Sequence, residues 1–168
     1  MGRSIPPTGL DRAAPHGPAL AVERRFRAAA RAYGLYGVVY LVGGLYLIAH
    51  GVGVAGARAG APAVPTMLYW GGIGLVPLVL IPLLLWHRWS WFGGWVSRRT
   101  FAWLVAVLLA VRAFKVAEVV LGGGGTVPAP WGGEISFRTG GVVFLTVTLM
   151  ALAFVVRAAW PHTAGGDR

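Results

Sequence analysis

Residues 101–121 read FAWLVAVLLAVRAFKVAEVVL. This stretch is apolar as far as Val111 and then carries Arg112, Lys115 and Glu118 at every third position. A helix of about 20 residues, rising ~1.5 Å per residue, crosses the ~30 Å hydrocarbon core of a bilayer. The sequence therefore predicts a transmembrane helix over 101–121 whose second half carries three ionisable groups.

Three further apolar runs of similar length surround this stretch, at 33–54, 67–86 and 139–160. The 168-residue chain is 57% hydrophobic and only 12% charged, whereas a soluble domain carries about 25% charged residues. The linkers between the runs are short, and short linkers make sequence neighbours pack antiparallel. We expect an all-α integral membrane protein in which residues 33–160 form an up-down bundle of four transmembrane helices.

The arginines are distributed unevenly among the segments outside these runs. Eleven lie before the first run, between the second and third, or at the end of the fourth and beyond it (Arg157 and Arg168), and two lie in the other two linkers. Cytoplasmic segments of membrane proteins carry such an excess, so we predict that both termini are cytoplasmic. The Ala-, Gly- and Arg-rich composition favours a bacterial source and hence the bacterial inner membrane. The net charge of +10 lies beside apolar runs rather than in a groove, which argues against nucleic acid and for an anionic inner leaflet as partner.

The segment before the first run divides into two parts. Residues 1–17 are rich in proline and polar residues, which predicts a flexible tail, and residues 161–168 form a C-terminal tail. Residues 18–32 predict a basic amphipathic helix, because Phe26 and other apolar residues share one face and arginines occupy the rest. This helix is either solvated or lies on the inner leaflet with Phe26 dipping into it. The first apolar run begins only near Tyr33, so no cleaved signal peptide is expected.

The three ionisable groups of the third run are the main candidate site. Arg112 lies about 16 Å from the cytoplasmic end of the predicted helix, near the bilayer midplane, and Lys115 and Glu118 lie further out. A charged group at the bilayer centre costs at least ~2.5–3.5 kcal/mol. These side chains are therefore expected to face the bundle interior, a wet cavity or another subunit, with His50 and Glu134 as possible partners.

Two interpretations of this charged face stay open. Arg112 and Lys115 can be snorkelling or paired residues that only set the register of the helix. Alternatively, the face binds or conducts an anion, a proton, a quinone-like carbonyl or a lipid headgroup, since ionisable groups inside membranes commonly serve a function.

Two patterns in the first and second runs concern helix geometry. Gly37, Gly44 and Gly51 recur at intervals of seven, which indicates a packing stripe for a helix of the same bundle or of another subunit. Pro77 and Pro82 each remove an amide donor, which predicts kinks that serve either as a structural bend or as a gating hinge.

The remaining motifs point away from catalysis. The chain has no cysteine, and its four histidines show no metal-binding spacing, so no metal site and no particular cofactor are implied. The four glycines at 122–125 lack the Lys-Ser/Thr of a phosphate-binding loop, and we expect them to end a helix and begin a flexible outer loop. The sequence favours a protein that is not an enzyme.

Three functional hypotheses follow. The first is a non-catalytic membrane subunit, or an assembly or stabilising factor, of a larger bacterial inner-membrane complex such as an energy-converting one, docking through the first run or the charged face. The second is a small oligomeric channel or transporter whose path is lined by Arg112, Lys115 and Glu118. The third is a protein that binds a lipophilic cofactor such as a quinone or a pigment.

Overall fold

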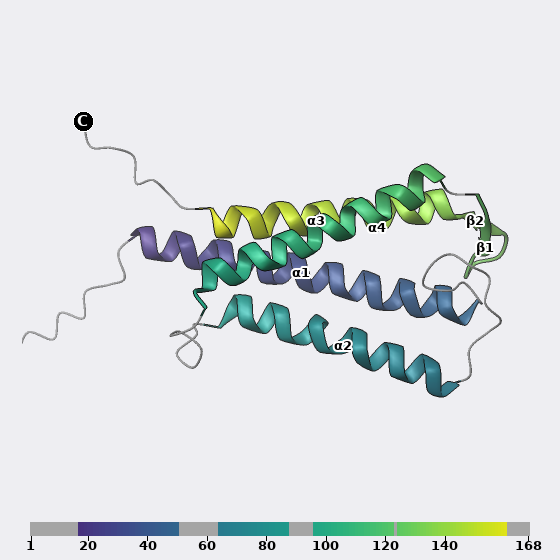
Figure 1. The fold of residues 1–168 in the computed structure, drawn as a ribbon, viewed down its shortest axis with the longest axis horizontal. Coiled ribbons are helices and arrows are strands. Elements are labelled where there is room, and N and C mark those ends of the chain that lie inside the picture. The colour runs from purple at the N-terminus through teal and green to yellow at the C-terminus, as the bar shows by residue number, and fades with distance from the viewer. Residues whose placement is uncertain (1–16, 51–63, 88–95, 123, 161–168) are drawn as a thin grey trace, which may run out of the picture.

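A computed structural model describes residues 17–50, 64–87, 96–122 and 124–160 of the chain. This part is mostly helical and contains four helices and one short β-hairpin (Figure 1). The elements are α1 (Gly17–Ala49), α2 (Val64–Trp86), α3 (Arg98–Gly122), β1 (Thr126–Pro128), β2 (Glu134–Ser136) and α4 (Phe137–Ala159). Gly51 and the predicted tails, apart from Gly17, lie outside the described residues.

Helices α2, α3 and α4 begin and end within one turn of the apolar runs at 67–86, 101–121 and 139–160. Side-chain hydroxyls help to set two of these beginnings. Ser97 accepts a hydrogen bond from the amide of Thr100 at the start of α3, and Ser136 accepts one from Thr139 at the start of α4, both at 3.1 Å. Each bond satisfies an amide that has no partner within the first helical turn.

Helix α1 differs from the predicted arrangement of a separate basic helix at 18–32 and a span at 33–54. It is one continuous helix from Gly17 to Ala49. Phe26 is only 2% exposed and belongs to the hydrophobic core, together with Tyr33. The basic part of α1 therefore packs within the bundle, because its apolar face is flanked by alanines small enough to let other helices approach.

The helices contact one another in the order α2–α1–α4–α3. α1 packs against both α2 and α4, and α4 packs against α3, whereas α2 and α3 make few contacts. Figure 1 shows the four helices running roughly side by side, with the hairpin at the end opposite to the start of α1.

The hydrophobic core lies in the half of the bundle that contains the start of α1 and the end of α4. Alanines dominate it, and its larger members include Phe26, Leu85, Leu109 and Val155, each at most 2% exposed. The side chain of Thr148 is also buried, and its hydroxyl donates to the carbonyl oxygen of Phe144 at 2.6 Å. This half of the bundle is filled by close-packed side chains.

The segment predicted as a flexible outer loop forms the antiparallel hairpin of β1 and β2, in which Val127 pairs with Ile135. Gly125, Gly132 and Gly133 have positive φ values of 128°, 91° and 83°, conformations that glycine adopts without a steric penalty. The glycines therefore make an ordered turn at this end of the bundle.

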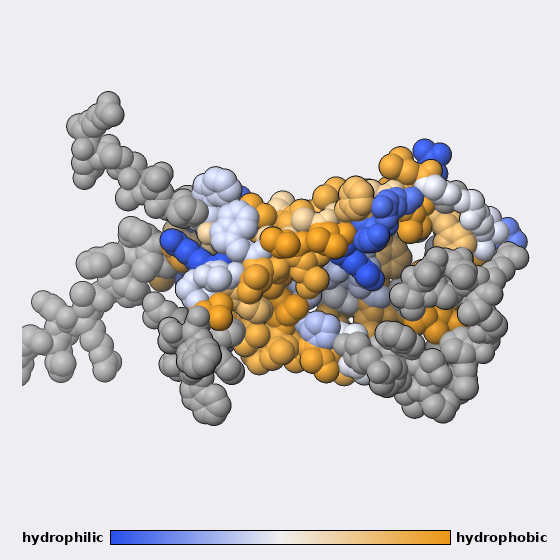
Figure 2. Space-filling view, viewed as in Figure 1, coloured by the Kyte–Doolittle hydropathy of each residue, from blue (hydrophilic) through white to orange (hydrophobic). Residues whose placement is uncertain are grey.

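Two helices are long and apolar enough to cross a membrane, α1 over Leu20–Ala49 and α4 over Phe137–Ala159. The described apolar part of α2, Gly74–Trp86, is shorter. α3, with five ionisable side chains in 25 residues, is not among the candidates. Figure 2 shows hydrophobic side chains over much of the visible face of the helices, interrupted by hydrophilic patches.

Candidate functional site

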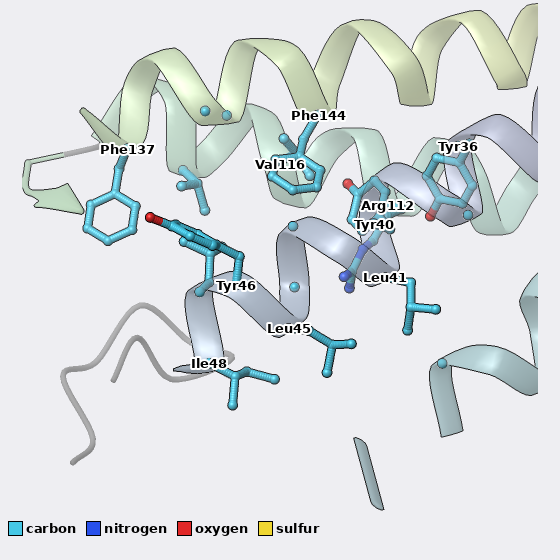
Figure 3. A pocket seen from close by; sticks show the side chains of 18 of the residues that line it. Tyr36, Tyr40, Leu41, Leu45, Tyr46, Ile48, Arg112, Val116, Phe137 and Phe144 are labelled. Atoms are coloured by element: carbon cyan, nitrogen blue, oxygen red, sulfur yellow. The ribbon is translucent and has the colours of Figure 1, made fainter. Parts of the chain in front are cut away.

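A cavity of about 570 Å³ lies between the helices on the hairpin side of the core. The largest share of its wall comes from α1, and α2, α3, α4 and the hairpin supply the rest. Tyr36, Tyr40, Arg112 and Phe144 line it (Figure 3). Gly44 and Pro77 also belong to its wall. Its volume falls within the range of about 300–1,000 Å³ that is typical of small-molecule sites.

Aromatic side chains from α1 and α4 form one wall of this cavity. The ring centroids of Tyr36 and Tyr40 lie 4.5 Å apart, one helical turn from each other. Phe144 of α4 meets Tyr40 edge to face at 4.8 Å. Contacts of this geometry are favourable beyond simple burial, so they fix the shape of the wall.

Arg112 of α3 faces this aromatic wall. Its guanidinium carbon lies 5.0 Å from the centroid of the Tyr40 ring, and the guanidinium interacts with the hydroxyl of Tyr36. Among the described residues, no carboxylate lies within 4.0 Å of Arg112. The cavity therefore holds a positive charge that a ring face and a phenol stabilise but do not neutralise.

Lys115 and Glu118 lie further along α3. Lys115 Nζ is 3.4 Å from a carboxylate oxygen of Glu118, and the two side chains are 67% and 51% exposed. Lys115 also lines the edge of the cavity. The structure thus divides the predicted charged face: Arg112 lines the cavity beside the aromatic wall and is itself exposed, whereas Lys115 and Glu118 form an exposed ion pair further along α3.

The two partners predicted for this face lie elsewhere. His50 stacks on Tyr46 at 4.3 Å between ring centroids, and its Nδ1 lies 2.9 Å from the carbonyl oxygen of Tyr46. Glu134 is exposed in β2, opposite Pro128. In the described part of the chain, neither residue forms an ion pair with the charged face.

Tyr46 attaches the hairpin to the end of α1. Its hydroxyl donates a hydrogen bond to the carbonyl oxygen of Pro128 in β1. The amide of Phe137 donates to the carbonyl oxygen of Gly125 at 3.0 Å, which ties the hairpin to the start of α4. The hairpin therefore covers the end of the cavity that lies away from the hydrophobic core.

The glycines of the predicted stripe have different surroundings. A Cβ atom at Gly37 would lie 2.2 Å from Leu78 Cδ1 of α2, so α1 and α2 approach closely there. A Cβ atom at Gly44 would meet no atom within 4 Å, because Gly44 borders the cavity. Its neighbour Gly43 makes the close approach to α4 instead, where an added Cβ would lie 2.2 Å from the ring of Phe144.

Pro77 and Pro82 both lie inside α2, which is assigned as helix through each of them. Pro77 lines the cavity together with Gly74 and Leu78. Pro82 is not among the residues that line the cavity, and the roles of both prolines as a bend or a hinge stay predictions.

A second polar cluster at the opposite end of the bundle was not predicted. Arg98, the first residue of α3, donates to Glu23 of α1 at 2.9 Å and to the carbonyl oxygen of Leu85 in α2 at 2.9 Å. A further bond of 3.0 Å reaches the carbonyl oxygen of Trp86. The hydrogen bond from Arg98 lowers the pKa of Glu23 below its usual 4.5. We call Arg98, Glu23 and the two carbonyls the arginine clasp.

Other arginines surround the clasp. Arg27 and Arg31 lie 5.8 and 5.6 Å from the ring of Trp86, and Arg98 lies 4.1 Å from the ring of Phe26. The separation of Glu23 and Arg98 by 75 residues explains why sequence reasoning missed the clasp. The local sequence feature that pointed to the clasp was a single acid, Glu23, directly before a group of arginines.

The chain matches no known protein-family model, no curated protein and no solved structure. Among the described residues, no group of three or more His, Cys, Asp or Glu side chains is placed to hold a metal ion.

Proposed function

We propose that this protein is a four-span membrane protein, with both termini cytoplasmic, that serves as a non-catalytic subunit or assembly factor of a larger complex in a bacterial inner membrane. Its docking surface is the outward face of α3. A transmembrane helix of a neighbouring subunit covers this face.

Exposed apolar side chains on all four helices support the membrane assignment. Val42 of α1, Val79 of α2, Val107 of α3 and Val143 of α4 are each at least 54% exposed in the isolated chain. Apolar surface of this extent is rare on soluble monomers and is expected where lipid or another helix covers it. The basic end with Arg27, Arg31 and Trp86 fits a cytoplasmic boundary.

The spacing of exposed side chains on α3 supports the docking face. Leu104, Leu108, Val111, Lys115 and Glu118 follow one another at alternating steps of four and three residues, and each is more than half exposed. A period of 3.5 residues keeps one stripe facing a partner helix over several turns. We call these five residues the α3 stripe.

The ion pair of Lys115 and Glu118 within the α3 stripe is the main support for the proposal. Lys115 and Glu118 lie about 26 and 30 Å along α3 from Arg98, toward the outer side of the membrane. Both charges then lie near the outer edge of the ~30 Å hydrocarbon core, where contact with lipid disfavours them by less than the ~2.5–3.5 kcal/mol that applies at the bilayer centre. A neighbouring helix with hydrogen-bonding side chains at this depth relieves that cost, and an apolar surface at the level of Leu104–Val111 completes the contact.

The arrangement disfavours a channel through one copy of the chain. A path along the bundle axis would have to pass the core around Tyr33, Leu85 and Leu109, whose side chains are buried and close-packed. Conduction along Lys115 and Glu118 would therefore require several copies that enclose a pore between them.

Site-specific photo-crosslinking in native membranes tests the docking face. We expect a crosslinker in place of Leu108 to give one discrete adduct, and one in place of Val42, an equally exposed α1 residue, to give none. Glu118→Leu should reduce the adduct several-fold without loss of folded protein, because an exposed ion pair contributes only about 0–1 kcal/mol to stability. Equal yields from both positions, or a yield unaffected by Glu118→Leu, would refute the proposal, and the adduct mass distinguishes another subunit from a second copy.

A further inference from the structure

We propose that the cavity binds an anionic amphiphile, whose phosphate or carboxylate contacts Arg112 and whose apolar portion lies against the aromatic wall of α1 and α4. The site is built around Arg112, which is not a member of the α3 stripe, although Lys115 borders the cavity and also belongs to the stripe. The two proposals are tested with different variants and different readouts, so each can fail without the other.

The charge of the ligand follows from the surroundings of Arg112. Its guanidinium has a ring face at 5.0 Å and a phenol as neighbours, and no carboxylate within 4.0 Å among the described residues. Glu118, an acid on the same helix, is paired with Lys115 instead. A guanidinium at membrane depth binds phosphate or carboxylate with paired N–H donors, and an anion there removes an unfavourable isolated charge.

The apolar character of the ligand follows from the rest of the wall. Beyond Arg112 and Lys115, the cavity is lined largely by aliphatic and aromatic side chains, among them Leu41, Leu45, Ile48 and Phe144 (Figure 3). A volume of about 570 Å³ accommodates an acyl chain or a compact ring system but not a whole phospholipid. A lipid ligand would therefore insert one chain and leave the remainder in the bilayer.

The ligand enters the cavity from the side of the helix bundle. The core closes the cavity toward the arginine clasp, and the hairpin, held by Tyr46, covers its other end. α2 and α3 make few contacts, and among its described side chains α2 contributes Gly74, Pro77 and Leu78 to the wall. An amphiphile in the surrounding membrane reaches Arg112 between these two helices.

Two glycines of α1 provide a matched pair for a steric test. A Cβ atom at Gly44 or at Gly34 would meet nothing within 4 Å, so a side chain can start at either position without a clash at its first atom. Only Gly44 lines the cavity. Gly44→Leu therefore places a four-carbon side chain at the cavity wall, where it competes with a ligand for space, and Gly34→Leu makes the same chemical change in the same helix outside the cavity.

Native mass spectrometry of the full-length protein in mild detergent gives the readout. The probes are phosphatidylglycerol for a headgroup phosphate, palmitate for a free carboxylate, and phosphatidylcholine as the zwitterionic control. We expect one anionic probe to bind more tightly than phosphatidylcholine, and the preferred probe identifies the source of the anion. Arg112→Gln should weaken that binding about tenfold, Arg112→Lys should retain most of it, and Gly44→Leu should abolish it while Gly34→Leu does not.

Three results would overturn the inference: phosphatidylcholine bound as well as both anionic probes, no probe bound at all, or Gly44→Leu binding like the unmodified chain. Thermal unfolding of each variant shows whether it is folded. If Arg112→Gln fails to fold, the test rests on lipid binding by Gly44→Leu compared with Gly34→Leu, because neither substitution changes Arg112.

Discussion

Arg98 Nη1 lies 2.9 Å from Glu23 Oε2, which joins the first turn of α3 to the basic part of α1 across 75 residues of sequence. The same guanidinium caps the end of α2 through the carbonyl oxygens of Leu85 and Trp86. One side chain thus holds three helices together where the chain would otherwise leave helix ends unpaired.

Loss of the arginine clasp should destabilise the bundle. Arg98→Ala removes an ion pair that is 16% and 24% exposed at its two side chains, and leaves two helix-terminal carbonyls without this donor. We expect the free energy of unfolding to fall by about 2–3 kcal/mol. Arg99→Ala changes the exposed neighbouring arginine and should have little effect. Equal unfolding midpoints for the two variants in detergent would contradict the role assigned to Arg98.

The clasp should also make stability depend on pH in the acidic range. The pKa of Glu23 is lowered from 4.5 in the folded chain, so its carboxylate stabilises the fold above pH 4.5. That contribution is lost as the pH falls below 4.5, through the folded-state pKa, because the protonated acid no longer pairs with Arg98. The difference in unfolding midpoint between the unmodified chain and Glu23→Gln should therefore be constant near neutral pH and shrink in acid. Glu134→Gln, at an exposed position in β2, should follow the unmodified chain throughout; a Glu23→Gln difference that grows in acid would exclude this explanation.

The sequence predicted the helices of this protein well because their signal is local. Apolar runs such as 101–121 and 139–160 specify both the helix and its length, and the structure places α3 and α4 within a turn of them. The continuity of α1 was missed because arginines dominate the count at 18–32, whereas the position of Phe26 in the core depends on helices far away in sequence.

The candidate site was predictable only in part, for the same reason. The spacing of Arg112, Lys115 and Glu118 marked α3 as unusual. Periodicity alone does not say which of these charges lies beside the aromatic wall of the cavity. The cavity depends on α1, α4 and the hairpin meeting around Arg112, and the hairpin strands are three residues each within a Gly- and Pro-rich linker. Strands this short leave no alternation of apolar and polar residues to detect.

Two adjacent glycines of α1 should respond oppositely to alanine. At Gly44 the added methyl group meets nothing, so Gly44→Ala should stabilise the helix by about 1 kcal/mol through helix propensity. At Gly43 the methyl group would collide with the ring of Phe144 and displace it from Tyr40, so Gly43→Ala should cost about 1–2 kcal/mol net. Unfolding midpoints measured side by side check this, and two shifts of the same sign would show that the packing of α1 on α4 differs from that described.

Single-cysteine labelling tests most directly the proposed four-span membrane bundle with its basic end in the cytoplasm. The chain has no cysteine of its own, so each introduced thiol reports one position. In intact bacterial cells we expect a membrane-impermeant maleimide to label Trp131→Cys, between the strands of the hairpin, and to leave Arg24→Cys and Arg99→Cys unlabelled until the membrane is opened. Labelling of Arg24→Cys or Arg99→Cys in intact cells, or protection of Trp131→Cys there, would contradict the proposed topology.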